Sequence, residues 1–305
     1  MNRVFVIGSA NMDLVIGAPR LPEMGETIHG DNFFTNPGGK GANQAVAAAR
    51  AGAKTYFCGL VGEDLYGDTL AGELKNSGVD ISLLGRVRGC SSGVAVITVV
   101  QGDNCIVLDG GANMRVAEKN IDDYLKEAHG GDVLLIQQEI PSKTVVYALK
   151  KGKEKGMLTL LNPAPAQNFD KEALRFADIV LPNETEAAEL SGGAEYSEAA
   201  EILAENGCTV IVTLGAQGCH IFADGQGAGI ACPKVKAADT TAAGDTFCGY
   251  LAARLAEGRS LEKAVGDALA AASLAVTRRG AQKSIPFADE VEQFKSKQPD
   301  NSETL

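Results

Sequence analysis

Short runs of apolar residues recur along this chain, and stretches with helical spacing separate them. The runs do not alternate with polar residues, which is typical of strands buried on both faces. They occupy residues 4–7, 133–136, 158–161, 179–181 and 210–214, and the helical stretches cover residues 41–51, 67–76, 142–155, 184–190 and 197–205. This repeated order of strand and helix predicts an α/β fold, with a doubly wound, mostly parallel sheet sandwiched by helices.

Two regions depart from this order. Residues 14–36 carry several Pro and Gly residues, and residues 93–109 form two apolar runs separated by the polar residues 101–104, which is a β-hairpin signal. We expect both regions to form a small β-sheet over the carboxyl ends of the main strands, where it would act as a lid. The sequence therefore predicts a single domain over residues 1–305, with a lid from about residues 14–37 and 89–110 and a frayed polar tail from residue 296.

The charge balance argues against a nucleic-acid partner. The chain has 28 Lys and Arg against 39 Asp and Glu, for a net charge of -11, and proteins that bind phosphate backbones are usually basic. An anionic nucleotide would need a metal ion and backbone amides to offset this field.

The spacing of the cysteines and the lengths of the apolar runs indicate the cellular compartment of the protein. The seven cysteines form no C-x-x-C pair, so neither a zinc site nor a disulfide framework is expected and a reducing environment fits best. The first residues lack a signal-peptide pattern, and no uninterrupted apolar stretch reaches the length of about 18 residues needed to span a membrane. We expect a cytoplasmic protein with no membrane partner.

Residues 38–43 read Gly-Gly-Lys-Gly-Ala-Asn and lead into an alanine-rich helical stretch. Glycines permit close approach of the backbone to a ligand, and Lys40 and Asn43 add hydrogen-bonding groups suited to hydroxyls. The segment either cradles a polyol or is a turn that lets a helix of small residues pack tightly. It fits neither the P-loop pattern nor G-x-G-x-x-G, which disfavours P-loop NTPases and Rossmann dehydrogenases.

Asp245 ends the run Asp-Thr-Thr-Ala-Ala-Gly-Asp, just before a helix with Phe247, Leu251 and Leu255 at intervals of four. Small residues there leave the amides of residues 242–245 open to an anion, and a carboxylate at this place would accept the proton of an attacking hydroxyl. The simpler interpretation is that Asp245 only caps the helix.

Together these two segments resemble the two signatures of the ribokinase-like (PfkB) carbohydrate kinase family. The resemblance covers essentially the whole chain, and residues 38–50, 162–166 and 276–282 look like those of its ribose-phosphorylating members. It implies an α/β sandwich with a small β lid, transfer of a phosphoryl group from ATP to the 5-hydroxyl of D-ribose, Mg²⁺ and an activating K⁺. A flat, exposed edge of the lid would also offer a pairing surface for a twofold homodimer. The alternatives are a kinase of the same family acting on deoxyribose, a nucleoside or another sugar, and a non-catalytic sugar-binding relative.

The resemblance also implies site residues. Asp245 would be the base, with the amides of Ala242, Ala243 and Gly244 completing an anion hole. The sugar would contact Asn11, Asp13, Gly39, Lys40, Asn43, Glu139 and Asp245. Read without the resemblance, Asn11 and Asp13 favour a turn, and Glu139 is an ordinary solvated residue at a strand end.

For the nucleotide, the resemblance implies Asn183, Thr213, Gly215, Gly218 and Gly244, with Glu186 near Mg²⁺ through water. Asn183 and Glu186 equally fit a helix cap with an acidic first turn.

A loop that binds a monovalent cation is the last element implied. Its contributors would be Asp239, Thr241, Ala275, Arg278, Gly280 and Ser284. Cys248 stands where relatives often carry Asn, and it is either a buried inert thiol or a site of oxidation.

Overall fold

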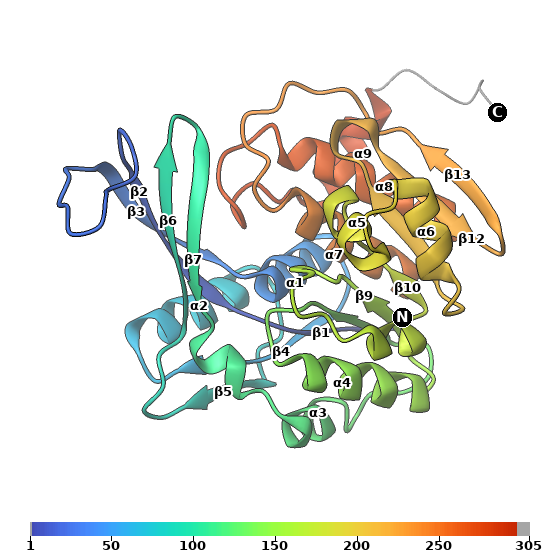
Figure 1. Ribbon diagram of the computed structural model, residues 1–305. Coiled ribbons are helices and arrows are strands. Elements are labelled where there is room, and N and C mark those ends of the chain that lie inside the picture. The colour runs from blue at the N-terminus through green and yellow to red at the C-terminus, as the bar shows by residue number, and fades with distance from the viewer. Residues whose placement is uncertain (1, 298–305) are drawn as a thin grey trace.

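A computed structural model describes residues 2–297 of the chain, and a large sheet forms its centre (Figure 1). Within those residues this sheet has nine strands, which are parallel from β5 to β11, while β12 and β13 are antiparallel. The order from edge to edge is β13 (Gln226–Ile230), β12 (Cys219–Ala223), β11 (Thr209–Thr213), β10 (Ile179–Val180), β9 (Leu158–Leu161), β8 (Val133–Ile136), β1 (Val4–Ile7), β4 (Thr55–Gly62) and β5 (Leu84–Val87).

Helices cover both faces of this sheet because its central strands are apolar on both sides. In β1, Val4 and Val6 pack into one core, and Phe5 and Ile7 pack into the other. The first face carries α1 (Lys40–Arg50), α2 (Leu65–Asn76), α7 (Ala243–Ala256), α8 (Leu261–Ala275) and α9 (Ala288–Ser296). The second carries α3 (Glu118–Tyr124), α4 (Ser142–Glu154), α5 (Glu184–Ser191) and α6 (Tyr196–Ala204), with the 3₁₀ turns η1 (Gly111–Arg115) and η2 (Lys171–Phe176).

A second, smaller sheet stands beside the main body (Figure 1). Its order is β3 (Asp31–Gly38), β2 (Asn11–Gly17), β6 (Gly93–Val100) and β7 (Asp103–Asp109). The sheet is mixed, since β2 and β6 are parallel and the outer pairs are antiparallel. The predicted hairpin is confirmed: β6 and β7 are joined at Gln101 and Gly102, both with positive φ, as a tight two-residue turn requires.

The predicted strands and helices are confirmed close to their expected bounds, and so is the α/β class. Seven of the strands and helices in the described residues were not expected, namely β4, β5, β12, β13, α3, α8 and α9. Of the expected frayed tail, Ser296 ends α9, while residues 298–305 lie outside the described residues. None of the helices in the described part of the chain is long and apolar enough to cross a membrane.

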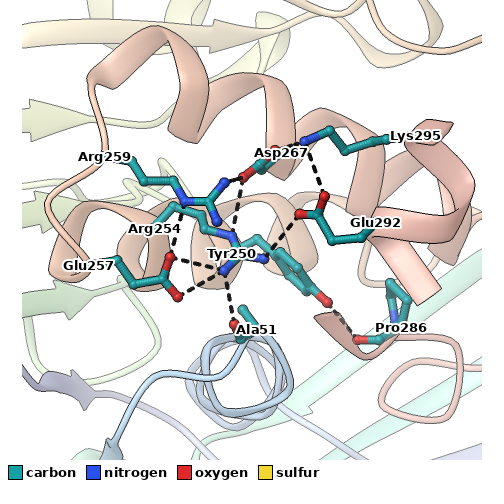
Figure 2. Close-up of polar contacts among 9 residues, drawn as sticks. All are labelled: Ala51, Tyr250, Arg254, Glu257, Arg259, Asp267, Pro286, Glu292 and Lys295. Carbon is teal, nitrogen blue, oxygen red and sulfur yellow. Dashed lines mark hydrogen bonds and ion pairs between the residues drawn. The ribbon is translucent and has the colours of Figure 1, made fainter. Parts of the chain in front are cut away.

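Buried charges join the three C-terminal helices (Figure 2). Arg254 of α7 is 4% exposed and Asp267 of α8 is 2% exposed. Arg254 Nη1 donates to Glu257 at 2.8 Å, while its Nε lies 3.3 Å from Asp267 without a hydrogen-bonding angle. Asp267 also pairs with Arg259 at 2.5 Å and with Lys295 of α9. Each buried charge thus has an opposite partner, as burial demands.

Candidate active site

Asp245 lies in the first turn of α7 and is buried, with 8% of its surface exposed. The turn before it is tight, because the N-cap Ala242 has a left-handed conformation with φ of 60°. The amide of Ala243 donates to Thr240 O at 3.2 Å, so it is not free. Within the described residues, the amides of Ala242, Gly244 and Asp245 have no acceptor. Three of the four predicted anion-hole amides are therefore open to an anion.

Both oxygens of the Asp245 carboxylate are held by amide side chains from α1. Asn43 Nδ2 donates to Oδ2 at 3.0 Å, and Gln44 Nε2 donates to Oδ1 at 3.0 Å. The glycine-rich segment and the Asp245 segment thus meet, as the resemblance implied. The capping interpretation of Asp245 is wrong, since its side chain points to α1 and makes no cap hydrogen bond.

Glu139 gathers a second group of polar side chains at the end of β8. Its Oε2 accepts from Ser9 Oγ at 2.5 Å, from Asn11 Nδ2 at 3.2 Å and from the amide of Lys40 at 3.1 Å. These residues come from the β1–β2 connection and the start of α1. The carboxylate therefore joins Asn11 to the glycine-rich segment and is not simply solvated.

Gly39 is required where α1 begins. It has φ of 90°, and a Cβ there would lie 2.7 Å from Asn11 N and 2.9 Å from Ala10 Cα. Only glycine accepts both the conformation and this contact. The close approach brings Lys40 and Asn43 up to the strand that carries Asn11 and Asp13.

Asp13 and Lys40 have perturbed ionisation. Burial and the negative charge of Glu139 raise the pKa of Asp13 to about 7, against a hydrogen bond from Asn36 that lowers it. For Lys40, burial lowers the pKa, but the carboxylates of Asp245 and Glu139 outweigh it, so the pKa is raised overall. Displaced pKa values in one place are typical of a functional site.

Two cavities meet at Thr240. The first, of about 190 Å³, is lined by Lys40, Asn162, Ala164, Leu181, Asn183, Glu186, Thr213, Thr240, Ala242, Ala243, Gly244, Asp245 and Cys248. The second, of about 500 Å³, is lined by residues of the small sheet, among them Asp13 and Asn36, and by residues of the loop before α7, among them Asp239 and Thr241.

The predicted nucleotide residues divide into two groups. Asn183, Thr213, Gly244 and Glu186 line the first cavity. Gly215 begins the 3₁₀ turn η3 (Gly215–Gln217) and Gly218 follows it, and neither lines that cavity. Asn183 and Glu186 form a reciprocal capping box at α5, with hydrogen bonds of 2.8 and 2.9 Å. The capping interpretation of this pair is therefore confirmed, and burial raises the pKa of Glu186.

The predicted cation-loop residues are brought together from two segments. Asp239 accepts from Thr241 at 2.6 Å and from the amide of Gly280 at 2.9 Å, and the Ala238 amide donates to Val276 O at 2.7 Å. Arg278 pairs with Glu290 at 2.6 Å. The carbonyl of Ala275 already accepts from the Arg278 amide, and Ser284 Oγ donates to Ala281 O.

The structure adds site residues that the sequence did not reveal. Gln44 donates to Asp245 and is itself held by Gln137 and Asn162. Asn113 donates to Asn11, and Ser9 donates to Glu139. A group of buried amide side chains has no signal in the sequence, because Asn and Gln residues are mostly exposed and nothing marks the few that are buried. Cys248 is buried, and burial raises the pKa of its thiol, which fits the inert alternative.

Comparisons with known proteins agree on one family. Residues 1–288 match the family described as pfkB family carbohydrate kinase. A ribokinase of Bacillus subtilis (strain 168) is 41% identical over 296 residues, covering 97% of this chain and 100% of that protein. A solved ribokinase of Thermotoga maritima has a TM-score of 0.90 at 38% identity, covering 97% of this chain and 100% of that one. The Arabidopsis thaliana ribokinase complexed with ribose and ATP has a TM-score of 0.89 at 34% identity, covering 96% and 99%.

Proposed function

Because the chain belongs to the pfkB family of carbohydrate kinases, we propose that it transfers the γ-phosphoryl group of ATP to the 5-hydroxyl of D-ribose. The products are ribose 5-phosphate and ADP. The similarity to ribokinases, one of them solved with ribose and ATP, supports this acceptor.

One observation carries the proposal: a buried carboxylate and free backbone amides lie in the same helix turn. Asp245 takes the proton of the attacking hydroxyl, and the amides of Ala242, Gly244 and Asp245 receive the charge that develops on the phosphoryl group. Since Asn43 and Gln44 fix both carboxylate oxygens, the base has one orientation. Fixed placement of this kind lowers the barrier to reaction.

The sugar binds between the small sheet and α1. Asn11, Asp13, Lys40, Asn43 and Glu139 offer the mixture of donors and acceptors that vicinal hydroxyls need. Glu139 already gathers Asn11 and the Lys40 amide, so this group is formed before the sugar arrives.

The nucleotide phosphates occupy the first cavity, near Lys40, Thr213 and Gly244. No group of three or more His, Cys, Asp or Glu side chains among residues 2–297 is placed to hold a metal ion. A hydrated Mg²⁺ that arrives on the phosphates needs only one carboxylate, and Glu186, which lines the cavity with one oxygen free of hydrogen-bond donors in the described residues, fits it. The ion would neutralise charge on the phosphates.

The loop around Asp239 fits a monovalent cation. Within the described part of the chain, the carbonyl oxygens of Thr241, Arg278 and Gly280 accept no hydrogen bond, and hard oxygen atoms suit potassium. Bound there, potassium would order the turn that leads into the anion hole. Ala275 and Ser284 contribute only if their present hydrogen bonds change.

The small sheet acts as a lid and as a dimer interface. It borders the second cavity, so its closure would exclude water and suppress hydrolysis of ATP. Its strands leave Phe33, Val96 and Val107 exposed by 63%, 45% and 73%, and apolar surface of this kind marks an interaction site. A twofold homodimer would cover it, and light scattering would give the mass of two chains.

The seven cysteines are all free, which supports a reducing compartment such as the cytoplasm.

Sugar-dependent release of ADP across a panel of ribose, deoxyribose, other pentoses and nucleosides tests the proposed function. We expect the highest kcat/KM with ribose. Turnover of a nucleoside without turnover of ribose would show that the acceptor is a nucleoside. Binding of sugars without any turnover would show that the protein is a non-catalytic relative.

A further inference from the structure

Gln44 lies between the catalytic base and a chain of buried amides. Its Nε2 donates to Asp245 Oδ1 and to Asn162 Oδ1, each at 3.0 Å, and its Oε1 accepts from Gln137 Nε2 at 2.6 Å. Gln44 and Gln137 are completely buried, and Asn162 is 8% exposed. We propose that Gln44 is a positioning residue for Asp245, held in one orientation by Asn162 and Gln137. The proposal rests on the proposed kinase function.

A backbone carbonyl determines which atoms donate and which accept in this chain of side-chain amides. Asn162 Nδ2 donates to the carbonyl of Leu181 at 2.8 Å, and a carbonyl can only accept. The oxygen of Asn162 must therefore face Gln44, which must present its NH₂ group to it. If the Gln44 amide turned over, its oxygen would meet the oxygens of Asn162 and Asp245 and the amide of Gln137 would lose its acceptor. The main chain after β10 thus determines which atom of Gln44 meets the base.

The donor from Gln44 has a chemical effect beyond packing. A hydrogen bond donated to a carboxylate favours its charged form, which is the form that accepts a proton from the sugar. Both protons of Gln44 Nε2 are used, so the amide cannot move to follow another partner. Hydrogen bonds to charged groups are roughly twice as strong as neutral ones, which makes this contact a sensitive point of the site.

Gln44→Met tests the role, because methionine has a similar length and no amide. We expect kcat with ribose to fall about 10- to 100-fold, the range for loss of one hydrogen bond to a charged group. The acid limb of the kcat profile should move to higher pH, since the carboxylate loses a donor, while KM for ATP stays unchanged. The kcat profile is the proper readout because it reports groups in the substrate complex, where Asp13 already meets the sugar.

Gln137→Met and Gln138→Met complete the series. Gln137 does not contact Asp245 in the structure but fixes the oxygen of Gln44, so its loss should move the acid limb in the same direction by a smaller amount. Gln138 is the neighbouring residue, is half-buried, and contacts Ser142 at 3.3 Å instead of the chain of amides. Gln138→Met should keep the wild-type profile.

The outcomes separate two questions. A wild-type protein that does not phosphorylate ribose would refute the proposed function, and the series would then use the sugar that it does phosphorylate. With wild-type activity in hand, a folded Gln44→Met with the kcat profile of Gln138→Met would overturn the positioning role. If melting curves show that Gln44→Met does not fold, Gln137→Met provides the test instead. An unmoved acid limb in the kcat profile of Gln137→Met would then overturn the positioning role of Gln44.

Discussion

Asn43 donates a hydrogen bond of 3.0 Å to the carboxylate of Asp245, although 202 positions separate the two residues in the chain. The contact joins the first turn of α1 to the first turn of α7. It brings a residue suited to sugar hydroxyls next to the residue suited to remove a proton. Folding thus brings together the proposed acceptor site and the proposed base from distant parts of the sequence.

We expect the raised pKa of Asp13 to make ribose binding depend on pH. Since burial and Glu139 raise this pKa to about 7, the free protein holds a proton on Asp13 at lower pH. Sugar hydroxyls donate best to the ionised form, so affinity for ribose should rise as pH increases toward 7 and level off above it. Calorimetry at pH 7 in buffers of different ionisation enthalpy should detect release of about half a proton per ribose. Asp13→Asn should bind ribose more weakly with no proton release, and equal release from both proteins would refute the assignment.

Gly39→Ala should destabilise the protein and weaken sugar binding. The new Cβ would lie 2.7 Å from the backbone of Asn11 at a positive φ, and strain of this kind costs about 1–3 kcal/mol. Gly72→Ala is the matched control, because Gly72 is within α2 with open space around it and alanine there should stabilise by about 0.5–1 kcal/mol. Urea unfolding of both variants measures the difference, and equal stabilities would contradict it.

Asp267→Ala should cost about 1.5–3 kcal/mol of unfolding free energy, because it removes the buried carboxylate that Arg254, Arg259 and Lys295 share, while Arg254 keeps its hydrogen bond to Glu257 (Figure 2). Glu154→Ala removes a carboxylate from an exposed ion pair with Lys151 and should change stability by less than about 1 kcal/mol. Denaturant curves distinguish the two, and a neutral Asp267→Ala would show that the C-terminal charges contribute nothing.

Much of the fold could be predicted because buried strands appear in the sequence as runs of consecutive apolar residues. The runs at residues 4–7 and 133–136 are apolar at every position and form β1 and β8 with those bounds. The glycine-rich, exposed edge strand β13 has no such signal, and α8 lacks a clear polar face because it packs against both α7 and α9 (Figure 1).

The site was predictable only where its residues stand in recognisable segments. Asp245, Gly39, Lys40 and Asn43 belong to such segments, whereas Gln44 reads as an ordinary residue of an alanine-rich helix. Its role comes from contacts with Asn162 and Asp245, more than 100 positions away. The residues next to Gln44 in the sequence do not reveal contacts with residues so distant in the chain.

Replacing potassium by tetramethylammonium at constant ionic strength should lower kcat several-fold. The large cation cannot approach carbonyl oxygens such as those of Thr241 and Gly280. Asp239→Asn should lessen the difference between the two salts, because the carboxylate that ties Thr241 to Gly280 is lost. A wild-type rate that is equal in both salts would show that the loop around Asp239 does not bind an activating cation.

Ribose-dependent ADP release by Asp245→Asn, measured alongside ribose binding by calorimetry, tests most directly whether Asp245 is the base. Asparagine keeps the size of the side chain but cannot accept the hydroxyl proton as a base. We expect kcat to fall by about 10²–10⁴-fold while ribose still binds. Undiminished phosphoryl transfer by this variant would contradict the assignment of Asp245 as the base.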